Sequence, residues 1–440
     1  MDDHYEQLFR RLNPVRVVVD NESCKNATVV RVDSASVYGI LLDVVQALAD
    51  LNLTITKAYI SSDGEWFMDG NILFPFFSPL SSLSFLPSVF NVTDQDGNKV
   101  VDSMLLDFIR NSVESQKPQI RSENNGTVIE MIGSDRPGLL SEMTAILASL
   151  SCDVRGANLW THNNLAAVVI DFTDAATSAA VEDEERLAKI TERFRHVLTG
   201  SNTMMEAKVS VSGETEHVER RLHRLMFLEK DYEAEQMSEK GNPIVKIENW
   251  DEKDYSVIAV TSKDRPKLLY DTLCALADLN YVVSHANVDT DGQHARHEYY
   301  VRDADGYPIK SDAERERVTS CLKAGITRRA SEGLKLELCT TDRVGLLSDV
   351  TRIFRENSLT VVRAEVKTSD GKARNTFYVE DVSGYPVDAK TIESIRQVMG
   401  EAILKVNGGV EDAPPQEAGF FRGLFRTRSF VNFGLVRSHS

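Results

Sequence analysis

Hydrophobic and polar positions along the chain follow one pattern, which is clearest between residues 127 and 211. Alternating apolar and polar residues predict half-buried strands, and apolar residues three and four apart predict a helix. The predicted elements are a strand at 127–132, a helix at 139–150, strands at 154–160 and 166–172, a helix at about 182–198 and a strand at about 205–211. Asn163 and Asn164 suit a tight hairpin between the middle strands. The order βαββαβ predicts a ferredoxin-like sandwich, with helices on one face of an antiparallel sheet.

The sequence of the turn between the first strand and the first helix occurs four times along the chain. It reads SDRPGLL at 134–140, KDRPKLL at 263–269 and TDRVGLL at 341–347, with a weaker ASVYGIL at 35–41. An alanine in an apolar run follows 19 positions after the fifth residue of each copy: these are Ala58, Ala157, Ala286 and Ala364. A register that persists over four copies indicates one repeated module. Numbered along the chain, the modules are called copies one to four.

The fold class we predict is α+β, with four tandem ferredoxin-like βαββαβ modules packed as two pairs. The fifth residues of the turns are separated by 99, 129 and 78 residues. Because the middle interval is the longest, we expect copy one to pair with copy two and copy three with copy four. A module of about 75 residues has a small core, so pairing stabilises both partners.

The expected domain boundaries follow from these intervals. They are an N-terminal segment at 1–26, copy one at 27–120, copy two at 126–212, a charged linker with a helix at 213–254, copy three at 255–332, copy four at 334–408 and a disordered tail at 409–440.

Residues 70–88 interrupt the third strand of copy one. The stretch GNILFPFFSPLSSLSFLPS has no charged residue, and without it the spacing of copies one and two approaches that of copies three and four. Phe, Leu, Pro and Ser, which dominate it, have pyrimidine-rich codons, and we interpret the stretch as retained intron sequence. The alternatives are an exposed hydrophobic loop or a membrane-touching segment, although three prolines make it a poor membrane span.

Charge and cysteine content narrow the function classes. The chain has 440 residues and a formal net charge of −17, which argues against nucleic acid as a partner because a clustered basic surface supplies most of that affinity. Five cysteines are scattered with no C-x-x-C pair, and the first residues lack an apolar core of signal-peptide length. We therefore expect a cytoplasmic or nuclear location.

The repeated turn inside a βαββαβ module resembles the ACT domain, a regulatory module of amino-acid metabolism. Four modules, with Leu12-Asn13-Pro14 and Val17-Val18-Val19-Asp20-Asn21 at the start, Glu219-Arg220-Arg221-Leu222-His223 in the linker and Arg428-Ser429-Phe430 near the end, resemble the plant ACT-domain-repeat proteins. The resemblance spans nearly the whole chain. It implies a free amino acid as ligand, held between adjacent modules.

The turn has the chemistry to bind an amino acid. A helix N-terminus offers free backbone N–H groups to a carboxylate, a glycine lets the ligand approach the backbone, and an aspartate can receive an ammonium group. An acidic residue before a helix is also an ordinary N-cap. The motif is intact in copies two and four, whereas copy three has Lys267 and copy one has Ser36. The predicted ligand-binding residues in these turns are Asp135, Arg136, Gly138, Asp342 and Gly345.

The resemblance also implies a contribution from the second strand of the adjacent module. Asn158, Asn287 and Glu365 occupy equivalent places there, as polar residues within apolar strands. They are the remaining predicted ligand-binding residues.

No catalytic or cofactor motif is found in the sequence. There is no phosphate-binding glycine loop, nucleophile elbow or H-E-x-x-H pattern, so we expect neither an enzyme nor a cofactor. His294 and His297 lie three apart on a predicted strand and should point to opposite faces, which disfavours a shared metal. We interpret both as surface histidines.

Two functions remain open. The first is a small-molecule sensor, and the second is a protein-interaction scaffold with vestigial ligand sites, in which self-association or protein partners act through the modules. The tail interleaves phenylalanine and arginine from 419 to 440 without an acidic residue. Such a segment suits either peripheral contact with an anionic membrane or docking on this acidic protein itself.

Overall fold

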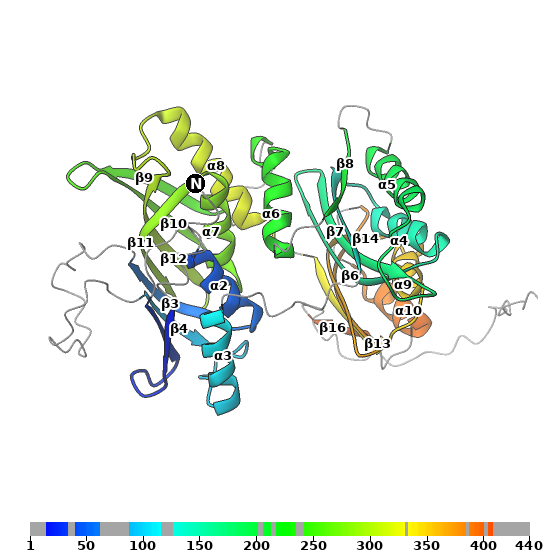
Figure 1. Cartoon of the computed structure of the whole chain (residues 1–440), viewed down its shortest axis with the longest axis horizontal. Coiled ribbons are helices and arrows are strands. Elements are labelled where there is room, and N and C mark those ends of the chain that lie inside the picture. Colours follow the sequence, from blue (N-terminus) through cyan, green and yellow to red (C-terminus); the bar gives the residue numbers. More distant parts are fainter. Residues whose placement is uncertain are drawn as a thin grey trace, which may run out of the picture. The chain divides into compact units, whose positions relative to one another are not determined.

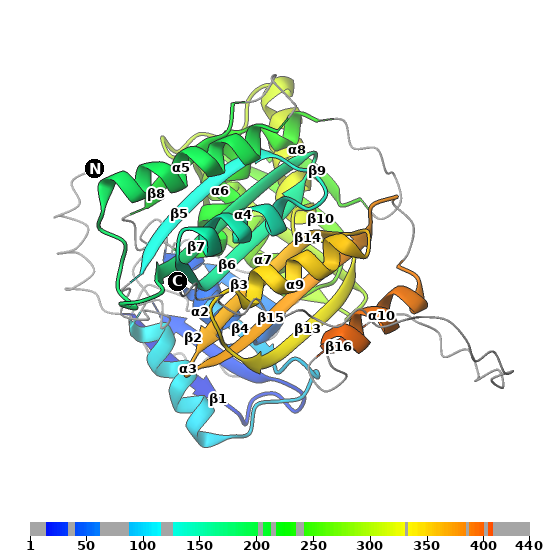
Figure 2. The ribbon, with the colours of Figure 1, turned by 90° about the vertical axis from the view of Figure 1, so that its right-hand side faces the viewer.

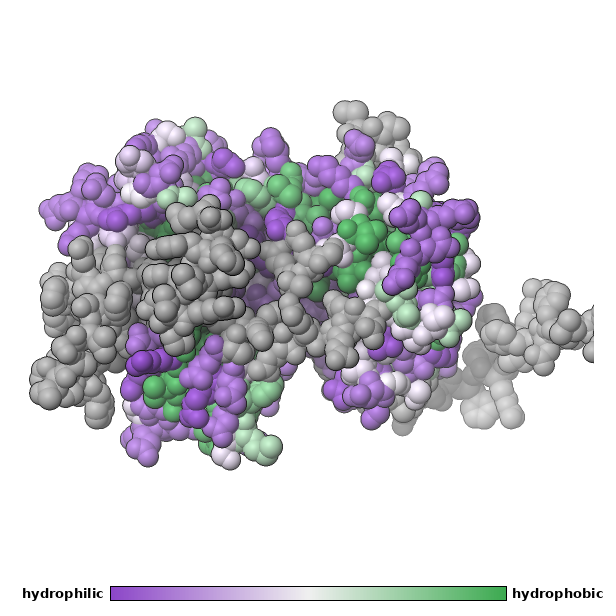
Figure 3. All heavy atoms as spheres, viewed as in Figure 1, coloured by the Kyte–Doolittle hydropathy of each residue, from purple (hydrophilic) through white to green (hydrophobic). Residues whose placement is uncertain are grey.

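The computed structural model describes residues 15–33, 40–61, 88–115, 126–200, 206–212, 217–234, 242–330, 333–383, 387–399 and 404–407. The stretch interpreted as retained intron lies outside these residues except for Ser88, and the basic tail lies wholly outside them. Within the described part, no helix is long and apolar enough to cross a membrane. Hydrophilic residues dominate the described part of the face shown in Figure 3, in keeping with the net charge of −17.

Copies one and three share one antiparallel sheet, shown in blue and yellow-green in Figure 1. Its strands are β1 (Arg16–Asp20), β2 (Thr28–Asp33), β3 (Thr54–Ser61), β4 (Ser88–Thr93), β9 (Ile244–Trp250), β10 (Tyr255–Lys263), β11 (Tyr281–Thr290) and β12 (His294–Asp303). They run in the order β1-β2-β4-β3-β11-β12-β10-β9.

Copies two and four share the second antiparallel sheet. Its strands are β5 (Thr127–Ser134), β6 (Cys152–His162), β7 (Leu165–Asp174), β8 (Lys208–Ser212), β13 (Leu334–Thr341), β14 (Leu359–Ser369), β15 (Lys372–Asp381) and β16 (Leu404–Asn407). They run in the order β16-β13-β15-β14-β6-β7-β5-β8.

The expected pairing of copies is wrong, because the pairs are one with three and two with four. The second strands make both seams: β3 pairs with β11, and β6 pairs with β14. Ala157 lies opposite Val366 and Ala364 opposite Leu159, so each alanine meets a larger apolar residue at the second seam. Distance along the chain misled the prediction, since pairing depends on which strand edges match and not on which modules are consecutive.

The edge strands also differ from the expected order. In copies two and four the edge strand follows the module, as β8 and β16, whereas in copies one and three it precedes the module, as β1 and β9. β1 and β9 therefore fall in the ranges that the sequence assigned to the N-terminal segment and the linker. A strand from either end of a module can pair with the same exposed edge, so the sheet is completed in both cases.

The helices cover one face of each sheet and form its core. On the first sheet these are α2 (Ile40–Asp50), α3 (Ser103–Ser115), α7 (Leu268–Asp278) and α8 (Asp312–Thr327), and on the second α4 (Leu139–Ser149), α5 (Glu184–Thr199), α9 (Leu346–Glu356) and α10 (Ala389–Met399). Figure 2 shows the second group in front of its sheet. The α+β class and the paired ferredoxin-like modules are confirmed.

The linker helix α6 (Val218–Leu228) packs on the opposite face of the second sheet. Its Leu222 and Met226 are fully buried against Trp160 and Ile132. The other side of α6 contacts α7, so this helix lies between the second sheet and the helices of the first, as Figure 1 shows. A single-turn helix, η1 (Asp231–Glu233), follows it.

Candidate functional site

The repeated turn has the same backbone geometry in the three copies that the structure describes. Gly138, Lys267 and Gly345 are the N-cap residues of α4, α7 and α9, with φ angles of 79°, 63° and 80°. None of the three caps makes a side-chain hydrogen bond to its helix. Asp135 is therefore not the N-cap of α4. The Leu139 N–H donates to the Arg136 carbonyl at 3.2 Å, and no cap side chain accepts from the other N–H groups of the first turn. Most of the turn of copy one lies outside the described residues, because residues 34–39 are not among them.

The turn of copy four borders a small recess against copy two. A Cβ atom added at Gly345 would meet nothing within 4 Å, so the backbone is open to a ligand. The recess has an internal volume of about 20 Å³, and apart from the turn its lining residues are Thr144, Ala148, Cys152, Asp153, Val154, Ser348, Val366, Thr368, Ala373 and Asn375. That volume is enough for about one water molecule, so a larger ligand requires the two copies to move apart.

Two polar side chains in the recess were not predicted from the sequence. Asn375 is 3% exposed, and its Oδ1 has no hydrogen-bond partner among the described residues. Burial raises the pKa of Asp153, and the nearby charge of Asp342 raises it further. The recess therefore combines a helix N-terminus with two carboxylates and an unpaired buried acceptor.

The residue at the position of Asn375 differs between the copies, and it is polar in the two copies that have a recess. The equivalent strand residue is Val168 in copy two and His297 in copy three. A recess like that of copy four is found beside the turn of copy three, and His297 lines it. Burial lowers the pKa of His297 to about 4, so this histidine is neutral at pH 7. It is buried, which corrects its interpretation as a surface histidine, while His294 is exposed on the other face.

The turn of copy two is covered by copy four. A Cβ atom added at Gly138 would lie 2.9 Å from Cδ of Arg355, on α9. Arg136 donates to both carboxylate oxygens of Glu142, at 2.8 and 2.5 Å. The motif is intact in sequence here, but its backbone is less open than that of copy four.

Asp135 gives the turn of copy two a pH-dependent stability. Burial raises its pKa to about 6, and the charge of Glu380 contributes to the rise. Because the folded state favours the protonated acid, the stabilising effect is complete below about pH 4 and is lost as the pH rises through 6. At pH 7 the free energy of unfolding of Asp135→Asn should therefore exceed that of the parent by about 2 to 3 kcal/mol. At pH 4 the two should be equally stable. Thermal unfolding at both pH values measures this.

Asp107→Asn is the matched control, because Asp107 is an exposed carboxylate on α3 that pairs with the exposed Arg110. Its unfolding midpoint should change little at either pH. Equal midpoints for Asp135→Asn and the parent at pH 7 would contradict the assignment of a buried charge to Asp135.

The three polar residues of the second strands lie on the wrong face to line a recess. Asn158 and Glu365 are opposite one another across the seam of the second sheet, and Asn287 is opposite Tyr59 across the first. Their neighbours Ala157, Leu159, Ala364 and Val366 point into the helix-covered core. Since side chains alternate along a strand, a residue one position away faces the other side. The residues of the second strands that line the copy-four recess are instead Cys152, Asp153, Val154, Val366 and Thr368.

Copy three uses its turn differently, because Lys267 replaces the glycine. The Lys267 ammonium group pairs with Glu219 of α6 at 2.7 Å. Arg265, from the same turn, pairs with the fully buried Asp271 at 2.6 Å. Glu365 is near both Glu219 and Lys267, so it belongs to the surroundings of this turn. No group of three or more metal-ligating side chains is found among the residues that the structure describes.

Comparison with known domains identifies the class of module. The model of the ACR family N-terminal ACT domain matches residues 23–73, and that of the ACT domain matches residues 336–398. Both are regulatory modules, and ACT domains as a class bind amino acids. The resemblance seen in the repeated turns is thereby confirmed.

Comparison with whole proteins identifies the family. The chain is 56% identical to the ACT domain-containing protein ACR4 of Arabidopsis thaliana, over 100% of this chain and 99% of that protein. It is 53% identical to ACR5 of the same plant, over 100% and 98%. The chain therefore belongs to the family of ACT domain-containing ACR proteins. A bifunctional uridylyltransferase/uridylyl-removing enzyme of Rhodospirillum rubrum is 28% identical over 45% of this chain but only 20% of the enzyme.

Proposed function

We propose that the protein is a non-enzymatic regulatory protein that binds a free amino acid in the recess between copies two and four. The observation that carries the proposal is the open turn at Gly345 next to the buried, unpaired Oδ1 of Asn375. A buried acceptor without a donor is unfavourable, and a ligand ammonium group would supply the donor. The N-terminus of α9 would bind the ligand carboxylate.

The lining favours a small amino acid. Thr144, Ala148, Val154 and Ala373 line the recess, and a small ligand requires the least separation of the two copies. Asp153 and Asp342 add negative charge, which favours the ammonium end of a zwitterion. We therefore favour a small neutral amino acid, such as glycine, alanine, serine or threonine, over a large or acidic one.

The size of the recess links binding to a change in shape. Thr144 of α4 and Thr351 of α9 share a hydrogen bond of 3.0 Å between their hydroxyl groups, which holds the two helices together. A ligand larger than water has to separate these helices or shift the turn. A ligand that binds the opened arrangement more tightly shifts the population toward it, which is how a protein without catalysis transmits a signal.

A thermal-shift screen of the proteinogenic amino acids tests this function. A small neutral amino acid at 100 times its dissociation constant should add about 2.7 kcal/mol to the stability of the protein. If none of the twenty raises the unfolding midpoint, the protein does not bind an amino acid, and the scaffold function replaces the sensor.

The scaffold function is supported by a separate observation. Arg355 covers the turn of copy two, and Lys267 of copy three is paired with Glu219, so two of the three described turns are filled by the chain itself. In a scaffold, protein partners or a second copy of the chain would act through the modules.

The five cysteines are all unpaired, which supports a reducing compartment, and we propose the cytoplasm or nucleus.

Replacing Asn375 separates ligand binding from stability. Asn375→Val introduces the residue that copy two has at the equivalent position, Val168. The variant should be as stable as the parent or more stable, by about 1 kcal/mol, because it removes an unsatisfied buried acceptor. Its affinity for the amino acid should fall about tenfold or more. Thermal unfolding and calorimetric titration measure the two effects.

Asn357→Val at the end of α9 serves as the control, since the Asn357 amide donates to the Ile353 carbonyl and lies outside the recess. It should lose stability and keep its ligand affinity. Unchanged affinity in Asn375→Val would exclude Asn375 from ligand recognition.

A further inference from the structure

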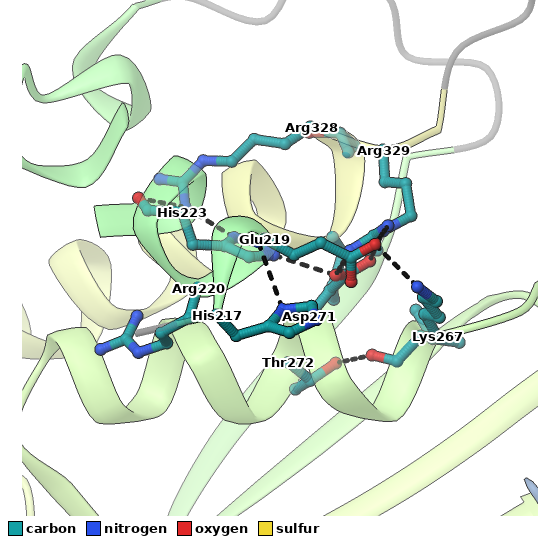
Figure 4. A network of polar contacts seen from close by, with 12 residues as sticks. His217, Glu219, Arg220, His223, Lys267, Asp271, Thr272, Arg328 and Arg329 are labelled. Carbon is teal, nitrogen blue, oxygen red and sulfur yellow. Dashed lines mark hydrogen bonds and ion pairs between the residues drawn. The ribbon is translucent and has the colours of Figure 1, made fainter. Parts of the chain in front are cut away.

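Glu219 of the linker helix α6 contacts the turn of copy three through Lys267. We propose that this turn is a carboxylate-binding site whose ligand is the side chain of Glu219, so that the chain supplies its own ligand and joins its two pairs of modules. This goes beyond the function proposed above, because it concerns copy three and requires no free amino acid. The Glu219 cluster is defined here as Glu219, Lys267, Asp271 and Arg329 (Figure 4).

The carboxylate of Glu219 is held by two cations. Its Oε1 accepts from Lys267 Nζ at 2.7 Å and from Arg329 Nη1 at 2.9 Å, and its Oε2 accepts from Arg329 Nη2 at 3.0 Å. The Arg329 contact is bidentate, which is the geometry that a guanidinium group uses to recognise a carboxylate. Glu219 is 8% exposed and Arg329 is 5% exposed. Burial would raise the pKa of Glu219, but Arg329 and Lys267 more than offset it, so the carboxylate is ionised.

A second acidic residue positions the same arginine. Asp271, on the first turn of α7, is fully buried and accepts from Arg329 Nη2 at 2.9 Å. It also pairs with Arg265 at 2.6 Å and with Nε2 of His223 at 2.9 Å. His223 is itself on α6, so the linker helix contributes two polar side chains to the surroundings of the turn. Asp271 orients Arg329 and Arg265, and Glu219 pairs with Arg329 and Lys267.

The lysine at this turn is suited to pairing with a carboxylate, whereas the glycines of copies two and four place no side chain at the turn. Lys267 has a φ angle of 63°, a backbone conformation that is unfavourable for a non-glycine residue. Its pairing with a buried carboxylate offsets that cost. Gly345 has no neighbour within 4 Å of its Cβ position, whereas the turn of copy three carries its own cation and already holds an acid.

The Glu219 cluster also contacts the second sheet. The guanidinium carbon of Arg329 lies 4.6 Å from the centre of the Trp160 ring, and Arg363 donates to the Arg329 carbonyl at 3.2 Å. Trp160 and Arg363 are opposite one another across the β6–β14 seam. On the same side of the sheet, Arg221 of α6 pairs with Glu130 of β5 at 2.7 Å. The internal carboxylate therefore connects the turn of copy three to the seam of copies two and four.

Chemical rescue of a truncated glutamate tests the proposal in the full chain. Glu219→Ala removes a group with the size and charge of acetate, and it leaves Lys267 and Arg329 without that partner. The thermal unfolding midpoint should fall, and sodium acetate should restore most of it along a saturating curve. Sodium chloride at equal ionic strength should not, which separates binding from screening. Hydrogen exchange of the α6 amides should speed up on truncation and slow again with acetate.

The control is Glu185→Ala, which breaks an exposed pair with Lys189 on α5. Its midpoint should change little, and acetate should act on it as chloride does. If acetate raises the midpoint of Glu219→Ala no more than chloride, the turn is not a carboxylate-binding site.

A second variant covers failure of Glu219→Ala to fold. Glu219→Gln keeps the shape of the side chain and removes its charge, and exchange of the α6 amides should accelerate about tenfold or more. Unchanged exchange over α6 would overturn the proposal. Neither readout involves amino-acid binding, so both results are independent of the function proposed for the copy-four recess.

Discussion

Asp271→Ala should destabilise the protein by about 3–5 kcal/mol, one of the two largest effects we expect. Asp271 is fully buried and pairs with Arg329, Arg265 and His223. Burial would raise its pKa, but Arg329 and Arg265 lower it well below the usual range, so the residue is a buried anion. Its removal takes an anionic partner from the buried Arg329 and from the partly buried Arg265, and breaking such a pair costs several kcal/mol. Thermal and urea unfolding of the full chain measure the loss.

The matched control is Asp289→Ala. Asp289 pairs with Lys57 across the seam of copies one and three, but the two side chains are 66% and 64% exposed. Exposed pairs contribute up to about 1 kcal/mol, so this variant should unfold close to the parent. A loss below about 1 kcal/mol for Asp271→Ala would mean that the buried charges around α7 are solvated and do not hold the pairs together.

Gly345→Val should abolish amino-acid binding, with a reduction in affinity of about a hundredfold or more. A branched side chain at this position would fill the approach to the N-terminus of α9, where the ligand carboxylate is expected to bind. The backbone at Gly345 has a φ angle of 80°, so valine also costs about 1 to 2 kcal/mol of stability. Calorimetric titration of the variant, at a temperature where it is folded, measures the affinity.

Gly306→Val provides the control for backbone strain. Gly306 has a φ angle of 87° and no neighbour within 4 Å of its Cβ position, and it lies in a loop of copy three away from the recess. It should lose similar stability and keep its ligand affinity. Gly138→Val should instead collide with Arg355 and disturb the packing of α9 on the turn of copy two. Full affinity in Gly345→Val would show that the turn is only the start of a helix.

The fold of each module could be predicted from the sequence, because its periodicities and turn residues are local signals. The alternation at β5, the helical spacing in α4 and the asparagines between β6 and β7 all correspond to observed elements. The partner of each module could not be predicted in this way. Pairing depends on contacts between β6 and β14 that are far apart in the chain, and the interval between turns carries no information about them.

The candidate site was predictable only in part, for the same reason. Asp342 and Gly345 belong to a motif and were found, whereas Asp153 and Asn375 reach the recess from another module and another strand. Asn158 and Glu365 were selected as polar residues in apolar strands, but a sequence pattern cannot say which face of the sheet meets the turn. The departure at Lys267 was visible in the sequence, and its partner Glu219 was not, since 48 residues separate them.

Calorimetric titration of the full chain with the small neutral amino acid that gives the largest thermal shift is the decisive experiment for ligand binding at the copy-four recess. We expect saturable binding that is lost in Gly345→Val and kept in Gly306→Val. Equal binding by the parent and Gly345→Val, or no binding of any amino acid by the parent, would contradict it.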